Sequence, residues 1–212
     1  MNATHRGKLL GLGAAVLLIN SACHHTSPSS SITTASPQPP KQQIRVNSLS
    51  LLHQLLDQQR NVNKLLLIKK ESTETHRLIE AIASASATGA RQLESFAAKD
   101  ASLRLDQMAL PPGEIAVRDA IASTKTKDLL TPSNPHFERN LLLTQVEALS
   151  YAWHLAKIAA LNEPTPARAQ YLTALSDEMK QLHQQTVSLM EARTELAQRR
   201  RLRPVKPSAQ LE

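Results

Sequence analysis

Cysteine, glycine and aromatic residues are scarce in this chain, and their scarcity excludes several classes of fold. The 212 residues include one cysteine, so no intramolecular disulfide can form. Aromatic residues make up 2% of the chain, whereas β-sandwiches and β-barrels usually depend on aromatic and β-branched residues. Glycine occurs five times, and Ala, Leu, Gln, Lys, Arg and Glu dominate the rest. This composition predicts a helical fold that is held together by packing alone.

Long apolar runs are also missing, apart from one near the N-terminus. Residues 9–19 are apolar but too few to span a bilayer as a helix. They follow a short positive segment that contains Arg6 and Lys8, an order typical of a signal peptide. The small residues Ser21 and Ala22 then precede Cys23, the single cysteine.

The segment Asn20-Ser21-Ala22-Cys23 resembles the lipobox of bacterial lipoproteins. The resemblance implies that residues 1–22 are a signal peptide and that Cys23 becomes the first mature residue, carrying fatty acids such as palmitate. Residue 24 is His and not Asp, which by resemblance to sorting in Gram-negative bacteria implies the periplasmic face of the outer membrane, with the inner membrane as the alternative. A plain secretory signal with an incidental cysteine and an uncleaved N-terminal anchor are the other interpretations.

Residues 23–46 are predicted to be a tether between the lipidated cysteine and the folded part. Ser, Thr and Pro dominate residues 24–41, and Ile32 is the one large apolar residue among them. Such a segment buries too little apolar surface to offset the loss of chain entropy on folding. We therefore expect the folded part to begin at residue 47.

Four long segments between residues 47 and 198 carry apolar residues at helical spacing. The expected seams are Leu49, Leu52, Leu55, Leu56, Val62, Leu65 and Leu66 in the first segment; Ile79, Ile82, Ser86, Gly89, Leu93 and Phe96 in the second; Leu142, Val146, Leu149, Trp153, Ala156 and Ala160 in the third; and Leu172, Leu175, Met179, Leu182, Thr186, Leu189 and Leu196 in the fourth. A shorter helix is expected over residues 113–130. The stripes predict an all-α protein, an antiparallel four-helix bundle with one extra short helix over residues 47–198.

Capping residues mark the expected helix starts. Ser72 or Thr73 is predicted to cap the second long helix, Asn134 the third, with a proline following it, and Thr165 the fourth. Gly89 lies among Ala and Ser residues, where it either lets a neighbouring helix approach closely or interrupts the helix. We favour close approach.

Three features follow the two N-terminal helices in order. They are a Leu110-Pro111 connector, a Phe137-Glu138 step at the start of the third long helix and a late His183 in the fourth. This order resembles a family of exported bacterial proteins of unknown function that have a ferritin-like four-helix bundle. The resemblance spans roughly residues 48–190 and implies the same fold. Members often carry an Asp-His pair in the second helix, but residues 85–90 here are Ala-Ser-Ala-Thr-Gly-Ala, so no metal or ligand role carries over from that pair.

Four histidines, one in each long segment, are the candidates for a metal site: His53, His76, His154 and His183. Di-iron bundles use inward carboxylates and Glu-x-x-His on two helices, and the chain contains no Glu-x-x-His. His53, His154 and His183 each lie beside a seam position, so we expect them to flank the core. The sequence therefore predicts no catalytic residue, no metal and no cofactor.

A basic run follows the fourth long segment, within a tail expected over residues 199–212. Residues 1–22 contribute two of the 25 basic residues and none of the 18 acidic ones. The whole positive excess of residues 23–212 therefore comes from Arg199, Arg200, Arg201, Arg203 and Lys206. A neutral body with a basic tail argues against nucleic-acid binding. The five cations either compensate the end of a helix or bind an anionic envelope surface.

These features together predict a lipid-anchored periplasmic helical protein with a structural or interaction role in the cell envelope and no enzymatic activity. Its expected partners are the membrane, through the N-terminal lipid, and either an anionic envelope surface or an envelope protein. A ferritin-like bundle that binds a small ligand or a metal is the alternative. A coiled-coil subunit of an envelope complex is a third hypothesis, to be favoured if the fourth long helix continues as an exposed rod to Arg203.

Overall fold

Helices form all the regular structure in the part of the chain that is described, as the composition predicts. The computed structural model describes residues 40–67, 69, 71–107, 110–131 and 134–201. The elements are α1 (Pro40–Gln59), a 3-10 helix η1 (Val62–Leu67), α2 (Thr73–Lys99), α3 (Pro112–Leu130), α4 (Phe137–Asn162) and α5 (Pro166–Arg201). The prediction of an all-α protein is confirmed for these residues.

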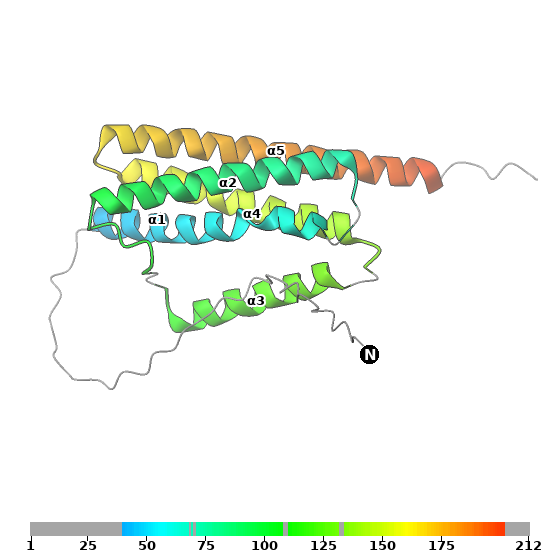
Figure 1. Ribbon diagram of the computed structural model, residues 1–212, viewed down its shortest axis with the longest axis horizontal. Coiled ribbons are helices and arrows are strands. Elements are labelled where there is room, and N and C mark those ends of the chain that lie inside the picture. The colour runs from blue at the N-terminus through cyan, green and yellow to red at the C-terminus, as the bar shows by residue number, and fades with distance from the viewer. Residues whose placement is uncertain (1–39, 68, 70, 108–109, 132–133, 202–212) are drawn as a thin grey trace, which may run out of the picture. The chain divides into compact units, whose positions relative to one another are not determined.

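Four of the helices contact one another in a closed order (Figure 1). α4 packs against α5 and α1, and α2 packs against α1 and α5, so each of the four has two neighbours. α3 contacts α4. Leucine, isoleucine and alanine side chains fill the space between the helices, with Leu52, Ile82, Leu142 and Leu172 fully buried. Burial of each such leucine or isoleucine contributes about 1.5–3 kcal/mol, which makes this packing the main source of stability.

The predicted seams are buried over most of their length. In α5 the seam is buried from Leu172 to Thr186, and Leu189 packs against the core while partly buried. Trp153 and Phe96 are likewise only partly buried. Leu196 is 56% exposed, so its assignment to the seam is wrong. The reason is length, because α5 continues beyond the point where Arg193 contacts the start of α4.

Gly89 lies at a close contact between helices, as the sequence predicts. An ideal Cβ at this position would lie 2.9 Å from Leu56 Cδ1 and 3.3 Å from Leu175 Cδ1. α2 is nevertheless continuous from Thr73 to Lys99. The glycine therefore provides room for the leucines of α1 and α5, and it does not interrupt the helix.

The helix starts agree only in part with the predicted caps. The Ser72 hydroxyl caps α2 by accepting a hydrogen bond from the Thr75 N–H, at 3.2 Å. Asn134 is not a cap, because its Oδ1 accepts from the His136 N–H at 2.9 Å and α4 begins only at Phe137. Thr165 does precede α5, but its hydroxyl accepts from the Arg168 side chain at 2.8 Å.

The first helical segment differs from the expected one at both ends. α1 begins at Pro40, so residues 40–46, which the composition assigned to the tether, are helical. Proline is well suited to the first turn of a helix, where its missing N–H costs no hydrogen bond. The helix then ends at Gln59, and the seam continues in η1, where Val62 is buried.

Candidate functional site

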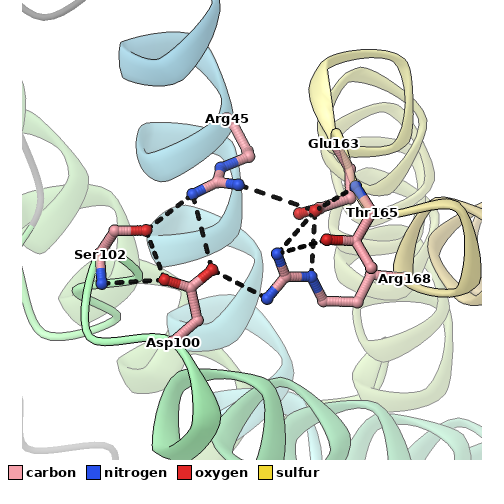
Figure 2. A network of polar contacts seen from close by, with 6 residues as sticks. All are labelled: Arg45, Asp100, Ser102, Glu163, Thr165 and Arg168. Atoms are coloured by element: carbon pink, nitrogen blue, oxygen red, sulfur yellow. Dashed lines mark hydrogen bonds and ion pairs between the residues drawn. The ribbon is translucent and has the colours of Figure 1, made fainter.

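Charged side chains meet where α2 and α4 end and α1 and α5 begin (Figure 2). Asp100 follows the last residue of α2, and Glu163 follows the last residue of α4. Arg45 lies in the second turn of α1 and Arg168 in the first turn of α5. Three parts of the chain that are distant in sequence, namely α1, the end of α2 and the connection from α4 to α5, thus form a cluster with two positive and two negative groups.

Arg168 connects both carboxylates of this cluster. Its Nη1 donates to Asp100 Oδ2 at 2.9 Å, and its Nε donates to Glu163 Oε1 at 3.0 Å. The Thr165 N–H also donates to Glu163 Oε1, at 3.0 Å. The Glu163 side chain is 0% exposed, so these contacts compensate a fully buried negative charge.

Arg45 approaches the same carboxylates from α1. Its Nη2 donates to Ser102 Oγ at 2.9 Å, and its Nη1 lies 3.7 Å from Glu163 Oε1. A longer distance of 3.9 Å separates Nη2 from Asp100 Oδ2. Arg45 is only 5% exposed, and a buried guanidinium needs nearby negative charge to remain in the interior.

Asp100 is held in its ionised form. The hydroxyl and the backbone N–H of Ser102 both donate to Asp100 Oδ1, at 2.6 and 3.0 Å. These bonds, with the hydrogen bond and the positive charge of Arg168, lower the pKa of Asp100 despite the opposing effect of burial. The cluster therefore presents two carboxylates, and each lies within ion-pair distance of both arginines.

An open recess of about 520 Å³ lies beside the cluster. It is lined by Arg45 and Glu163 together with Lys41, Gln42, Leu161, Asn162 and Pro164. Within the part of the chain that is described, the buried atoms Arg45 Nε and Glu163 Oε2 have no hydrogen-bond partner.

A second polar cluster joins the other ends of the helices. Arg193 Nη1 donates to Glu138 Oε2 at 2.6 Å, and the Ser72 hydroxyl donates to Glu138 Oε1, also at 2.6 Å. Arg193 also lies 3.8 Å from Glu74. Burial alone would raise the pKa of Glu138, but the bonds from Ser72 and the charge of Arg193 lower it. Residues from α4, α5 and the start of α2 are thus connected through one carboxylate.

Sequence reasoning missed both clusters, although a signal was present. Arg45 lies four residues before Leu49, and Arg193 lies four residues after Leu189, so each arginine occupies the apolar stripe of its own helix. A charged residue in register with a buried stripe needs a partner of opposite charge. That rule predicts a buried ion pair at each position but does not identify the carboxylate.

Three of the six site residues predicted from sequence lie outside the described residues. This applies to Cys23, Arg203 and Lys206. Arg199, Arg200 and Arg201 form the last turn of α5.

Two of the four histidines each lie beside a glutamate, whereas His154 and His183 both contact the ring of Trp153. His53 Nε2 lies 3.1 Å from Glu94 Oε1, and His76 Nδ1 lies 2.7 Å from Glu71 Oε1. His154 Nδ1 bonds to the carbonyl of its own helical turn, and the ring of His183 stacks on that of Trp153 at 6.0 Å. Among the described residues, no group of three or more His, Cys, Asp or Glu side chains is placed to hold a metal ion.

His53 and three carboxylates, those of Asp57, Glu94 and Asp106, line a further recess of about 530 Å³. Its other lining residues are Gln54, Ala97, Leu103 and Leu105. Three of these four polar groups are already paired, His53 with Glu94 and Asp57 with Arg60 at 2.7 Å. The recess is therefore acidic, but part of its charge is engaged within the chain.

Comparisons with protein families, with curated proteins and with solved structures find no match to this chain. A search of the described helices finds none with the length and apolar character that crossing a membrane requires.

Proposed function

We propose that this chain is a lipid-anchored periplasmic protein with a structural or interaction role in the cell envelope, and that it is not an enzyme. One observation carries the structural role. Ion pairs join the helices at both ends of the packed segment, through Arg45, Arg168 and Glu163 at one end and through Arg193 and Glu138 at the other. Charged groups that are engaged with one another in this way fix the helices in position.

The fold we propose for residues 40–201 is an antiparallel four-helix bundle. The contacts support it, because α1 and α5 begin beside the residues at which α2 and α4 end. At the other end Arg193, late in α5, meets Glu138 and Ser72 at the starts of α4 and α2. α2 and α4 then run in the same direction, with α3 in the long connection between them, as in bundles of the ferritin-like type. This layout supports the resemblance to the exported ferritin-like family.

The proposed location depends on the N-terminal sequence. Residues 1–22 have the order of a signal peptide, and Cys23 follows two small residues, so we propose that Cys23 is acylated at the periplasmic face of the outer membrane. The inner membrane remains the alternative location.

Replacement of Cys23 tests the anchor. We expect Cys23→Ala to leave an unprocessed precursor that carries no labelled palmitate and that intact-mass spectrometry finds without a lipid. Ser27→Ala, a similarly small change four residues further on, should mature normally. A Cys23→Ala chain that matures and fractionates with membranes like the wild type would contradict the lipoprotein proposal.

The interaction role is tested separately. Crosslinking of the lipidated protein in intact envelopes, followed by purification, should give a discrete set of crosslinked species. Elemental analysis of the same purified protein tests the alternative, since a metal-binding bundle would carry about one equivalent or more of a transition metal per chain.

A further inference from the structure

We propose that the C-terminal end of α5 docks on an anionic lipid membrane that lies across from the one holding the acylated N-terminus. This inference rests on the proposed lipid anchor at Cys23. It would make the protein a link between two membrane surfaces.

The first residue of α1 and the last turn of α5 lie at opposite ends of the packed helices. Arg45, in the second turn of α1, shares Glu163 with Arg168, in the first turn of α5. The starts of α1 and α5 are therefore neighbours. Because α5 runs away from this point, its last turn lies at the far end from Pro40, the first residue of α1 (Figure 1).

α5 is long enough to extend past the helices that it packs against. α5 has 36 residues, which at about 1.5 Å per residue gives a helix about 54 Å long. Its final eight residues, 194–201, continue about 12 Å beyond Arg193, the residue that contacts the starts of α2 and α4. Figure 1 shows this part of α5 extending past those two helices.

The part of α5 beyond Arg193 contains both an exposed leucine and a run of arginines. Thr194, Glu195 and Leu196 are exposed, and Leu196 is 56% exposed although it is a large apolar residue. Arg199, Arg200 and Arg201 follow it in the same helix. A helix end that combines exposed leucine with clustered arginine suits the surface of an anionic membrane, because apolar side chains enter the lipid while cations stay near the head groups.

The charge distribution supports a lipid partner at this end specifically. The basic run of residues 199–206 accounts for the whole positive excess of residues 23–212. At the other end of the helices, Arg45 and Arg168 are already paired with Glu163 and Asp100. Electrostatic attraction to an anionic surface should therefore act on the end of α5.

The single cysteine makes a direct test feasible. The chain from Cys23 onward is coupled through that thiol to maleimide lipid in neutral phosphatidylcholine vesicles, and fluorescent phosphatidylglycerol vesicles are then added. We expect the coated vesicles to capture the anionic ones, and we expect higher salt to weaken capture because exposed charges are screened within about 10 Å at 0.1 M salt.

Two variants identify the docking element. Replacing Arg199, Arg200 and Arg201 with Gln should reduce capture about tenfold or more, since each cation near such a surface contributes roughly 1 kcal/mol. Leu196→Gln, made with all three arginines in place, should also reduce capture of the anionic vesicles. Replacing the exposed Arg77, Arg91 and Arg139 with Gln removes the same charge elsewhere and should leave capture unchanged.

Three outcomes would overturn the proposal. Equal capture by the two triple variants would show that the body carries the affinity. Capture of a soluble polyanion but not of vesicles would identify an anionic polymer as the partner. Binding of the unanchored chain to anionic vesicles, with no capture once Cys23 is anchored, would show that the tail does not face away from the anchor. Because the anchor in this test is attached chemically, the measurement does not depend on acylation in cells. Failure of the docking proposal can therefore be distinguished from failure of the lipoprotein proposal.

Discussion

Arg193 on α5 and Glu138 at the start of α4 are joined by a hydrogen bond of 2.6 Å between Nη1 and Oε2. Their side chains are 31% and 23% exposed, so the pair is sheltered but not fully buried. Glu138 also accepts from Ser72, which caps α2. One carboxylate therefore holds three helices together, and Glu138→Gln should destabilise the protein by more than an exposed ion pair would, for which the range is roughly 0–1 kcal/mol.

The cluster around Glu163 should be more sensitive. Glu163→Gln leaves Arg45 and Arg168 with Asp100 as their one carboxylate partner in this cluster, and removing one partner of a buried pair typically costs about 3–5 kcal/mol. We expect the free energy of unfolding in urea to fall by that order. Glu191→Gln, at an exposed position of α5, is the matched control and should change stability by about 0.5 kcal/mol or less. Equal urea midpoints for the two variants would refute the role of the cluster.

The seam of α5 makes a second pair of variants informative. Leu182 is 7% exposed, so Leu182→Asp would bury a carboxylate without a partner. We expect this to lower the free energy of unfolding by several kcal/mol, whereas the total for a typical protein is about 5–15 kcal/mol. Lys180 is exposed, but its Nζ lies 5.2 Å from the centre of the Trp153 ring, so Lys180→Asp would also remove a cation–π contact. Gln181→Asp, also exposed, should cost little. Matching melting temperatures for Leu182→Asp and Gln181→Asp would contradict the seam.

Two helical glycines should respond to alanine in opposite directions. Gly113→Ala adds a methyl group where no atom lies within 4 Å, so it should gain about 0.5–1 kcal/mol from reduced backbone entropy. Gly89→Ala places that group against Leu56 and Leu175, and overpacking costs about 1–3 kcal/mol, which exceeds or cancels the same gain. Thermal unfolding should show Gly113→Ala to be the more stable of the two variants. A stabilised Gly89→Ala would mean that the leucines yield easily.

Stability should fall on acidification, and the sign follows from the two perturbed carboxyls. The folded state lowers the pKa of Asp100 and of Glu138, so each group stabilises the fold above its unfolded pKa of about 4. This contribution is lost as the pH falls through the folded value. Asp100→Asn should therefore destabilise the protein at pH 7, and its difference from wild type should shrink at about pH 2–3. A difference that is independent of pH would contradict the ionised state of Asp100.

Local periodicity was enough to predict the helices and most of their buried residues. Leu172 and Leu182 are buried because the spacing of apolar residues already defines one face of α5, whatever packs against it. The Ser72 cap could be predicted for the same reason, since its partner Thr75 lies three residues away. The prediction that Asn134 caps α4 is wrong because a short turn, in which Asn134 is bonded to His136, separates Asn134 from the helix.

The ion pairs could not be predicted in the same way. Arg45 and Glu163 are 118 positions apart, and they meet only because α1 begins where α4 ends. The exposure of Leu196 likewise depends on where its neighbours start, which no pattern within α5 records. Partners of this kind follow from the order and direction of the helices.

α3 is the described helix that we expect to open most readily. Val117 and Ile121 on this helix are 55% and 49% exposed, and Arg118 attaches it to Tyr151 of α4 through a hydrogen bond of 3.1 Å. Local opening requires least free energy where few apolar groups are buried. The amide hydrogens of α3 should thus exchange with deuterium long before those of α2, and among the described helices α3 should be the first that a protease cleaves.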